Sequence, residues 1–333
     1  MTRQRPTVAM YSLGGTIAMT PDGVSGGVTP ALSAEEILAA VPALADSGVT
    51  VRVRDFRQLP SPSLSLTDLA ELAAAIDVEL RTGEVDGVVI TQGTDTIEET
   101  AFFLDLRHDH DQPIVVTGAM RNPTTAGADG PANLHAAIIA ATDPRLRGTG
   151  CLVVLADEIH TARGVRKSHT TSPAAFTSPR TGPVGRVAEG KVQLAAGFTP
   201  RPHLALGPAL RPARVGLYTV ALGDDGALLS GWEGACDGLV VAAFGAGHVP
   251  AGLVPVLDRL AARVPVVLAS RIGNGPVLAA TYGYPGSEKD LLGRGLVSAG
   301  DLSPYQARLL LHALLTQGAD AAAVTKAFAA LNS

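Results

Sequence analysis

Short continuous runs of apolar residues alternate with longer helical patterns through the first half of the chain. The runs that predict strands are Thr7–Leu13, Gly87–Thr91, Pro113–Thr117 and Cys151–Ala156. The segments that predict helices are Ala34–Ala40, Thr67–Arg81, Ile97–Leu106 and Pro131–Thr142. Continuous valine and isoleucine runs, rather than strict alternation with polar residues, are typical of strands buried on both faces of a parallel sheet. We therefore expect a doubly wound, mostly parallel α/β domain.

The pattern changes between residues 190 and 213, where prolines and glycines replace the periodic segments. This composition predicts a linker. A second α/β set follows, with strands expected at Val215–Val220, Gly238–Ala243 and Val264–Ala269, and helices at about 303–317 and Ala321–Leu331. We therefore predict a catalytic α/β domain over residues 1–189, a linker over 190–213 and a smaller C-terminal α/β domain over 214–333.

Composition excludes several classes of function. The chain has 333 residues, 46% of them hydrophobic, and a formal net charge of −5, which favours neither nucleic acid nor an anionic membrane as a partner. No stretch reaches the ~18 uncharged apolar residues of a membrane span without glycine or proline breaks. Cys151 and Cys236 are expected to be free thiols, and no spacing typical of a metal site appears, so we expect neither metal nor cofactor. The first apolar run reads as a strand rather than a signal peptide, which predicts a cytoplasmic protein.

Two short threonine-bearing motifs follow two of the predicted strands. They read Ser12-Leu13-Gly14-Gly15-Thr16-Ile17-Ala18 and Thr91-Gln92-Gly93-Thr94-Asp95-Thr96-Ile97-Glu98-Glu99-Thr100. Each lies at the carboxyl end of a predicted parallel strand, the edge where ligands bind in open α/β sheets. A hydroxyl on a glycine-flanked loop is closely approachable, and a carboxylate beside it suggests nucleophilic chemistry.

Each motif alone has a simpler interpretation. Gly-Gly-Thr is common in turns, and Thr94-Asp95-Thr96 before two glutamates is typical of a capped, acid-rich first turn of a helix. For either motif taken singly, we would favour this structural interpretation over catalysis. Their joint occurrence after two strands reverses that preference.

Two further motifs carry a family resemblance. One is Thr117-Gly118-Ala119-Met120-Arg121 followed by Gly127-Ala128-Asp129-Gly130-Pro131-Ala132-Asn133-Leu134, and the other is Ala162-Arg163-Gly164-Val165-Arg166-Lys167-Ser168-His169-Thr170-Thr171. With these four motifs in order, the chain resembles the bacterial-type L-asparaginase/glutaminase family of threonine amidohydrolases. The matching motifs span Ser12 to Val187, and weaker matches extend to about Arg308.

The resemblance implies roles for residues in the first half of the chain. Thr16 matches the family's nucleophile, and Thr94, Asp95 and Lys167 match its second threonine-acid-lysine set. The expected substrate-binding residues are Gly15, Ser61, Gly93 and Ala119, with Ser61 at the position that binds the substrate's α-carboxylate and Ala119 at one that contacts its amide. The implied activity is hydrolysis of L-asparagine, with L-glutamine as a second candidate substrate.

The resemblance also implies an oligomer. Glu288 matches an acid that a neighbouring subunit lends to the substrate's α-amino group, and His248 falls at another position borrowed across that interface. Without the resemblance, Glu288 would read as part of an ordinary capped helix start and Lys167 as a solvated loop residue. A homodimer or homotetramer is therefore expected.

The residue types fit this chemistry. An alcohol is a weak nucleophile until a base removes its proton. Lys167 could act as that base, with Asp95 orienting it and Thr94 relaying a proton. Backbone N–H groups at the Gly93–Thr94 turn would stabilise the oxyanion. The pattern leaves open whether Thr16 or an activated water attacks the amide first.

The chain departs from the family pattern at three places. The loop over residues 21–30 lacks the tyrosine that usually lies beside the nucleophile, Pro62 stands where glutamine is usual after Ser61, and Gln92 stands where histidine is frequent. These departures bear on substrate preference and turnover more than on reaction class. We expect Tyr284 to replace the missing tyrosine, with Tyr282 second; both would otherwise be packing residues at a subunit interface.

Other functions remain open at this point. An asparaginase-like amidotransferase subunit shares these motifs but normally carries an N-terminal extension, whereas the first motif here begins near residue 1. A glutaminase-asparaginase and a non-catalytic amino-acid sensor on the same fold are further alternatives, although the sensor does not need all four of Thr16, Thr94, Asp95 and Lys167. A phosphate-binding enzyme is disfavoured because Gly14-Gly15-Thr16 lacks the lysine of a P-loop.

Overall fold

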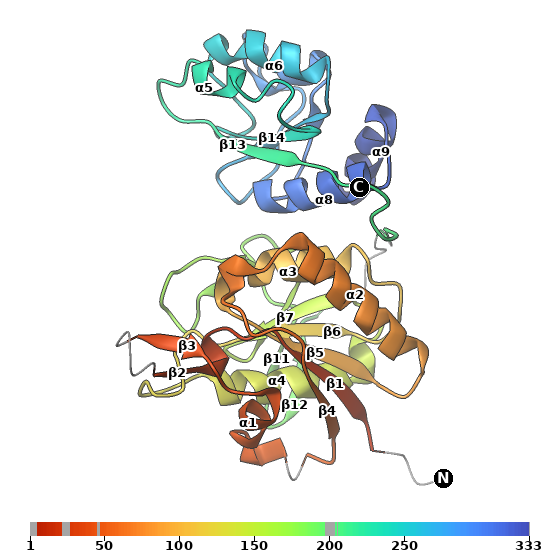
Figure 1. The fold of residues 1–333 in the computed structure, drawn as a ribbon. Helices are drawn as coiled ribbons and strands as arrows, with labels where there is room; N and C mark the ends of the chain where they lie inside the picture. Colours follow the sequence, from red (N-terminus) through yellow and green to blue (C-terminus); the bar gives the residue numbers. More distant parts are fainter. Residues whose placement is uncertain (1–4, 22–26, 45–46, 197–203, 205, 333) are drawn as a thin grey trace. The chain divides into compact units, whose positions relative to one another are not determined.

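The structure of the chain is a computed structural model that describes residues 5–21, 27–44, 47–196, 204 and 206–332. The chain forms two compact units, Met1–Ala205 and Leu206–Ser333 (Figure 1). Each unit has its own sheet and its own buried core. The predicted α/β class, with a larger and a smaller domain, is confirmed.

Within the residues that the structure describes, the first unit is built on an eight-stranded sheet. Across the sheet the strands run β12 (Lys191–Leu194), β11 (Gly185–Ala188), β8 (Glu158–Thr161), β7 (Cys151–Leu155), β6 (Ile114–Thr117), β5 (Gly87–Thr91), β1 (Thr7–Ser12) and β4 (Thr50–Asp55). Strands β4, β1, β5, β6 and β7 are parallel, and the last three at the other end pair antiparallel. The central strands β5, β6 and β7 are buried at every position, as their continuous apolar runs predict.

Helices cover both faces of this sheet. Helices α2 (Leu66–Arg81) and α3 (Ile97–Asp105) lie on one face, and α1 (Ala34–Ala39) and α4 (Gly130–Thr142) lie on the other (Figure 1). The core under α1 and α4 joins alternate strand residues such as Met10 and Val89 to Leu134 and Ile138. A short antiparallel pair, β2 (Met19–Pro21) and β3 (Val28–Pro30), follows the first threonine motif.

The four strands and four helices predicted in the first half all form, with ends that differ by at most one residue. The predicted linker begins too early, because residues 191–194 form β12. Val192 of this strand is buried in the core and pairs with Val187 of β11. Alternating Lys, Val, Gln and Leu, rather than a long apolar run, made this edge strand hard to separate from the proline-rich segment after it.

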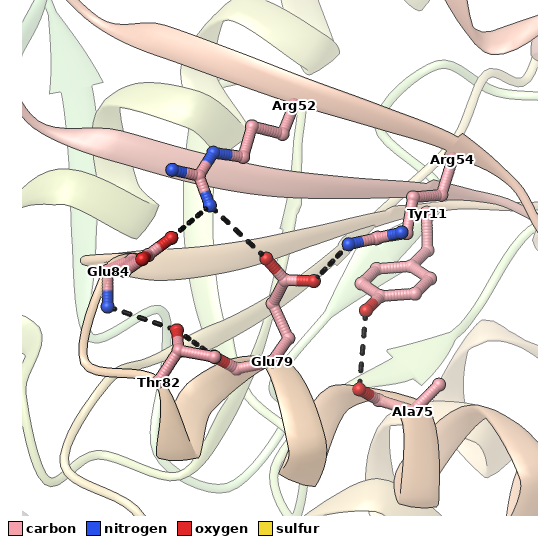
Figure 2. Close-up of polar contacts among 7 residues, drawn as sticks. All are labelled: Tyr11, Arg52, Arg54, Ala75, Glu79, Thr82 and Glu84. Atoms are coloured by element: carbon pink, nitrogen blue, oxygen red, sulfur yellow. Dashed lines mark hydrogen bonds and ion pairs between the residues drawn. The ribbon is translucent and has the colours of Figure 1, made fainter.

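Strand β4 was also missed, because it carries arginine at alternate positions. Arg52 and Arg54 point from this edge strand toward α2, where both meet Glu79 (Figure 2). The Arg54 Nη2–Glu79 Oε2 distance is 2.6 Å, the Arg52 Nη1–Glu79 Oε1 distance is 3.7 Å, and Glu79 is only 7% exposed. The buried Tyr11 lies beside this network, with its hydroxyl 3.4 Å from the Ala75 carbonyl (Figure 2). The pair of arginines thus fastens an edge strand to a helix through one shared carboxylate.

The second unit has a four-stranded parallel sheet. Its order is β13 (Val215–Thr219), β14 (Gly238–Ala243), β15 (Val266–Ser270) and β16 (Val297–Ser298). Its helices are α5 (Ala227–Ser230), α6 (Val254–Ala261), α7 (Glu288–Gly293), α8 (Pro304–Thr316) and α9 (Ala321–Leu331). Helix α8 begins at Ser303 with the predicted N-cap, in which Ser303 and Gln306 form a reciprocal capping box. The predicted strands and the two predicted helices of this half are present within two residues of their expected ends.

Two further expectations can be compared with the structure. Cys151 and Cys236 are both free thiols, as expected. In the described part of the chain, every helix is too short or too polar to cross a bilayer.

The shared carboxylate of Glu79 generates a stability prediction. Glu79→Ala should lower the free energy of unfolding by about 1–3 kcal/mol, because it leaves Arg52 and Arg54 without their buried partner on α2. Glu84→Ala is the matched control, since Glu84 is 61% exposed and pairs only with Arg52, at 2.8 Å. This control should cost under ~1 kcal/mol. Urea denaturation of both variants checks the prediction, and equal losses would contradict it.

Candidate active site

The first threonine motif leaves β1 through two glycines in the left-handed region. Gly14 and Gly15 have φ values of +94° and +84°, which a side chain would strain. Thr16 then opens a short 3-10 turn, Thr16–Ala18, and is half-buried. The chain therefore turns sharply at the carboxyl end of β1 and leaves Thr16 accessible at the sheet edge.

The second threonine motif touches the first one directly. A Cβ atom on Gly15 would lie 1.9 Å from the backbone nitrogen of Gly93, so the two loops meet where neither has a side chain. The Leu13 amide also donates to the Thr91 carbonyl at 2.8 Å. Thr94 starts a 3-10 turn, Thr94–Thr96, that leads into α3, and it is 6% exposed. The structure thus brings Gly15, Thr16, Gly93 and Thr94 together.

Ser61 reaches the same place from the segment after β4. It begins a 3-10 turn, Ser61–Ser63, and is 2% exposed. A Cβ atom on Gly93 would lie 2.7 Å from the Ser61 Oγ, so glycine at position 93 makes room for this hydroxyl. The Leu59 amide donates to the Leu13 carbonyl at 3.0 Å, which fixes this loop beside the first motif.

Ala119 follows β6 and is buried beside the first motif. A Cβ atom on Gly130 would lie 2.9 Å from Ile17 Cγ1 and 3.5 Å from Ala119 Cβ, so all three residues meet. Two residues that lie in the quoted motifs, but to which the sequence pattern assigned no role, hold this loop. Asp129 accepts hydrogen bonds from the amides of Met120 and Arg121, and Asn133 Nδ2 donates to the Gly118 carbonyl at 3.0 Å. An asparagine in a mostly apolar helix was the available signal for this role, and Asn133 is buried.

Lys167 completes the group from a distant segment. It lies in the two-residue strand β9 (Arg166–Lys167), which pairs with β10 (Phe176–Thr177). Its Nζ donates to Thr94 Oγ1 at 2.9 Å and to Asp95 Oδ1 at 2.6 Å. The Lys167 side chain is 13% exposed, whereas Asp95 is 64% exposed. The arrangement of an alcohol, an amine and a carboxylate matches the set that the resemblance implies.

Glu98 contacts the backbone of Lys167, a role that the sequence pattern did not indicate. Its carboxylate accepts a hydrogen bond from the Lys167 backbone amide. Burial raises the pKa of Glu98, although the nearby Arg166 and the Lys167 amide act in the opposite direction. Burial lowers the pKa of Arg166, and the negative charge of the nearby Glu98 acts in the opposite direction. Glu98 therefore holds the backbone from which Lys167 extends.

The remaining candidate residues form a separate cluster in the second unit. His248 Nε2 lies 3.2 Å from Glu288 Oε2, and the backbone amides of Thr281 and Tyr282 donate to Glu288 Oε1 at 3.0 and 2.8 Å. Burial raises the pKa of Glu288, but the hydrogen bonds from Tyr282, Thr281 and His248 outweigh it, so the pKa lies below its ordinary value. Glu288 is fully buried, while Ser287 caps α7. Its carboxylate thus does more than begin a helix.

Tyr284 and Tyr282 belong to this second cluster. The His248 ring centroid is 4.8 Å from that of Tyr282 and 5.5 Å from that of Tyr284, and the two tyrosines are 6.2 Å apart. Both tyrosines are nearly half-exposed. The assignment of Tyr284 as the missing tyrosine remains a hypothesis. The loop over residues 21–30, where the family usually has this tyrosine, includes residues 22–26, which lie outside the described residues.

The first group holds side chains and backbone amides that acyl transfer could use. Thr16 is accessible, Thr94 is hydrogen-bonded to an amine, and backbone amides lie at the Gly93–Thr94 turn. Nowhere in the described ranges do three or more His, Cys, Asp or Glu side chains gather in a way that could hold a metal ion. An alcohol, a base and oxyanion donors at one edge are the parts that nucleophilic catalysis on a carbonyl requires.

Family comparisons match both units. The family model "Asparaginase, N-terminal" matches residues 7–199, and "Glutaminase/Asparaginase C-terminal domain" matches residues 214–328. The chain belongs to the asparaginase family. It is therefore an enzyme of the amidohydrolase type, and the resemblance drawn from four motifs is confirmed.

Several asparaginases resemble the chain over nearly its full length. It is 38% identical to "Probable L-asparaginase" of Deinococcus radiodurans over 97% of both chains. It is 34% identical to "L-asparaginase 2" of Escherichia coli, over 97% of this chain and 92% of that one. The crystal structure of a probable cytoplasmic L-asparaginase from Campylobacter jejuni superposes with a TM-score of 0.84 at 32% identity, covering 97% of this chain and 99% of that one.

The contact between the two asparaginase loops generates a second prediction. Gly15→Ala should lower the free energy of unfolding by more than ~3 kcal/mol, because the new methyl group meets the Gly93 backbone, which cannot move like a flexible side chain. Gly83→Ala is the control, since its φ of +70° is also positive but nothing lies within 4 Å of the new Cβ. Thermal and urea unfolding should show a loss of only ~1 kcal/mol for the control. A Gly15→Ala protein as stable as the control would show that the loops are not in contact.

Proposed function

We propose that the protein hydrolyses L-asparagine to L-aspartate and ammonia, and that it acts on L-asparagine faster than on L-glutamine. The observation that carries the proposal is the placement of Lys167 Nζ 2.9 Å from Thr94 Oγ1 and 2.6 Å from Asp95 Oδ1. These two residues follow Gly93, whose backbone meets Gly15, the residue before Thr16. The names of the relatives support the substrate class, and one of them, of Pseudomonas aeruginosa, is called "Glutaminase-asparaginase". Glutamine is therefore the second substrate to measure.

The proposed reaction proceeds in two acyl-transfer steps. In the first, Thr16 Oγ attacks the side-chain amide carbon, and its proton passes to the Thr94–Lys167 pair. Backbone N–H groups of the Gly93–Thr94 turn stabilise the oxyanion, and ammonia leaves after it gains a proton. In the second step, water attacks the ester on Thr16 and restores the threonine, with L-aspartate as product. Lys167 must give up a proton before it can accept one, and Asp95 orients its amine throughout.

We also propose that each substrate site is completed by a neighbouring subunit, in a homodimer or homotetramer. A buried carboxylate with a lowered pKa, Glu288, suits recognition of the substrate's α-ammonium group, and His248 lies against it. Tyr284 stays our candidate for the missing lid tyrosine. The likeness to the Campylobacter jejuni protein, which is called a probable cytoplasmic L-asparaginase, supports a cytoplasmic location.

Ammonia release from free asparagine, without ATP or a partner protein, tests the proposed activity. Lys167→Met should lower kcat by about three orders of magnitude or more, as should Thr16→Ala and Thr94→Ala, because each removes part of one catalytic unit. Lys191→Met is the control, since Lys191 is an exposed lysine on the edge strand β12. A wild-type protein that releases no ammonia at millimolar asparagine would refute the function. If Lys167→Met lost melting temperature together with activity, a structural role for Lys167 would be the better account.

Mixed oligomers test the shared site. Thr16→Ala and Glu288→Ala chains should each be inactive alone, and unfolding and refolding them together should restore part of the activity. Hybrid oligomers would then contain sites in which an intact Thr16 faces an intact Glu288. The measurement is ammonia release against the mixing ratio, with light scattering to give the mass of the species. A fully active monomer, or no recovery in verified hybrids, would contradict the proposal.

A further inference from the structure

Gln92 is fully buried between the loops of the candidate site and is used by none of the steps above. Its Nε2 donates to the Gly93 carbonyl at 3.2 Å and to Thr96 Oγ1, also at 3.2 Å. Thr96 Oγ1 in turn donates to the Ser61 carbonyl at 3.4 Å. The three residues therefore form one directed chain of hydrogen bonds from the Thr94 turn to the Ser61 loop.

The direction of this chain is fixed by the chemistry of its members. The Gly93 carbonyl can only accept, so the amide nitrogen of Gln92 must face it. The Thr96 hydroxyl has a single proton, and when it accepts from Gln92 that proton is free to point at Ser61. An apolar residue at position 92 would remove the donor that sets this order.

The position of Gln92 carries a local cost in free energy. Its Oε1 atom is buried and has no hydrogen-bond partner. A buried acceptor without a partner is unfavourable, and such groups concentrate where function rather than stability selects the residue. Thr100 Oγ1, one turn into α3, is likewise buried without a partner but contacts neither loop through a hydrogen bond. Thr100 therefore serves as a comparison, because it has a buried polar atom without a partner but does not link the Thr94 turn to the Ser61 loop.

We propose that Gln92 is a positioning residue that fixes the Ser61 loop relative to the Thr94 turn and thereby favours asparagine over glutamine. This inference rests on the proposed function, in which Ser61 binds the α-carboxylate and the Thr16–Thr94 pair acts on the amide. The two substrates differ by one methylene between those ends. A site that holds both ends at a fixed span discriminates between them, and a loosened span does so less.

Gln92→Met tests the inference, because methionine has a similar length but lacks both the Nε2 donor and the Oε1 acceptor without a partner. The KM for asparagine should rise about tenfold while kcat changes less than about threefold, since the loss falls on substrate positioning. The ratio of kcat/KM for asparagine to that for glutamine should fall at least about fivefold. The Tm should stay within about 2 °C of the wild-type value, because the lost hydrogen bonds are offset by removal of the buried acceptor.

Two further variants separate positioning from packing. Thr100→Val should leave KM unchanged, because it removes a hydroxyl without a partner that lies outside the chain of hydrogen bonds. Thr96→Val should reproduce the KM change of Gln92→Met, and the double variant should be no worse than either single one, because both break the same chain. An equal KM change in Thr100→Val, or additive effects in the double variant, would overturn the inference. So would a Gln92→Met protein that loses Tm in proportion to its activity.

Amide hydrogen exchange of the substrate-free protein tests the positioning role of Gln92 without relying on the reaction. In Gln92→Met, peptides covering residues 59–65 should exchange faster than in the wild type, and in Thr100→Val they should not. A wild-type protein without amidase activity would refute the proposed function alone, with the positioning role still decided by exchange. Unchanged exchange together with an unchanged KM in Gln92→Met would refute the positioning role while leaving the proposed function intact.

Discussion

The close approach of Gly15 to Gly93 is the constraint on which the candidate site depends. A side chain on Gly15 would place its first carbon 1.9 Å from a backbone nitrogen, so the two loops can meet only with glycine there. That meeting puts Thr16 beside the turn that carries Thr94 and Asp95. Since Gly93 in turn leaves space for the Ser61 hydroxyl, three segments converge through positions that lack side chains. Backbone contact of this kind gives a firmer geometry than contacts between flexible side chains would.

Polar residues then hold the converged loops in place. Asp129 and Asn133 extend from the start of α4 and bind the loop after β6, and Glu98 binds the backbone of the strand that carries Lys167. Each replaces a backbone partner that the end of a strand would otherwise lack. These hydrogen bonds thus hold the loops at the strand ends of the parallel sheet in place.

The second unit follows a different principle. Glu288 is buried and its carboxylate already accepts hydrogen bonds from two backbone amides and faces His248. These donors satisfy the charge before any ligand arrives, so the carboxylate can remain ionised in a buried place. The rings of Tyr282 and Tyr284, each nearly half-exposed, pack against the ring of His248. A carboxylate that is held ionised in this way is suited to a cationic group, which agrees with the part in substrate recognition that the resemblance implies for Glu288.

The sequence by itself determined the parallel strands β1, β5, β6 and β7, the helices α1 to α4 and the reaction class of this protein. Short valine- and isoleucine-rich runs such as Gly87–Thr91 are typical of a buried parallel strand, and four motifs in order identified the family. Edge strands were less evident. Residues 50–55 and 191–194 alternate polar and apolar residues, and only tertiary partners such as Glu79 for Arg52 and Arg54 make the former a strand with a buried charge.

Only the tertiary structure decided how the site is supported. Gln92 appeared in the sequence as a departure from a family pattern, and its hydrogen bonds to Gly93 and Thr96 depend on a turn whose shape no local pattern specifies. The links between Glu98 and Lys167, or between Thr96 and Ser61, join residues tens of positions apart. Local propensity acts over a few residues, whereas these contacts exist because the strand ends of one sheet lie side by side. The chemistry could therefore be recognised from the sequence, and its positioning came only from the fold.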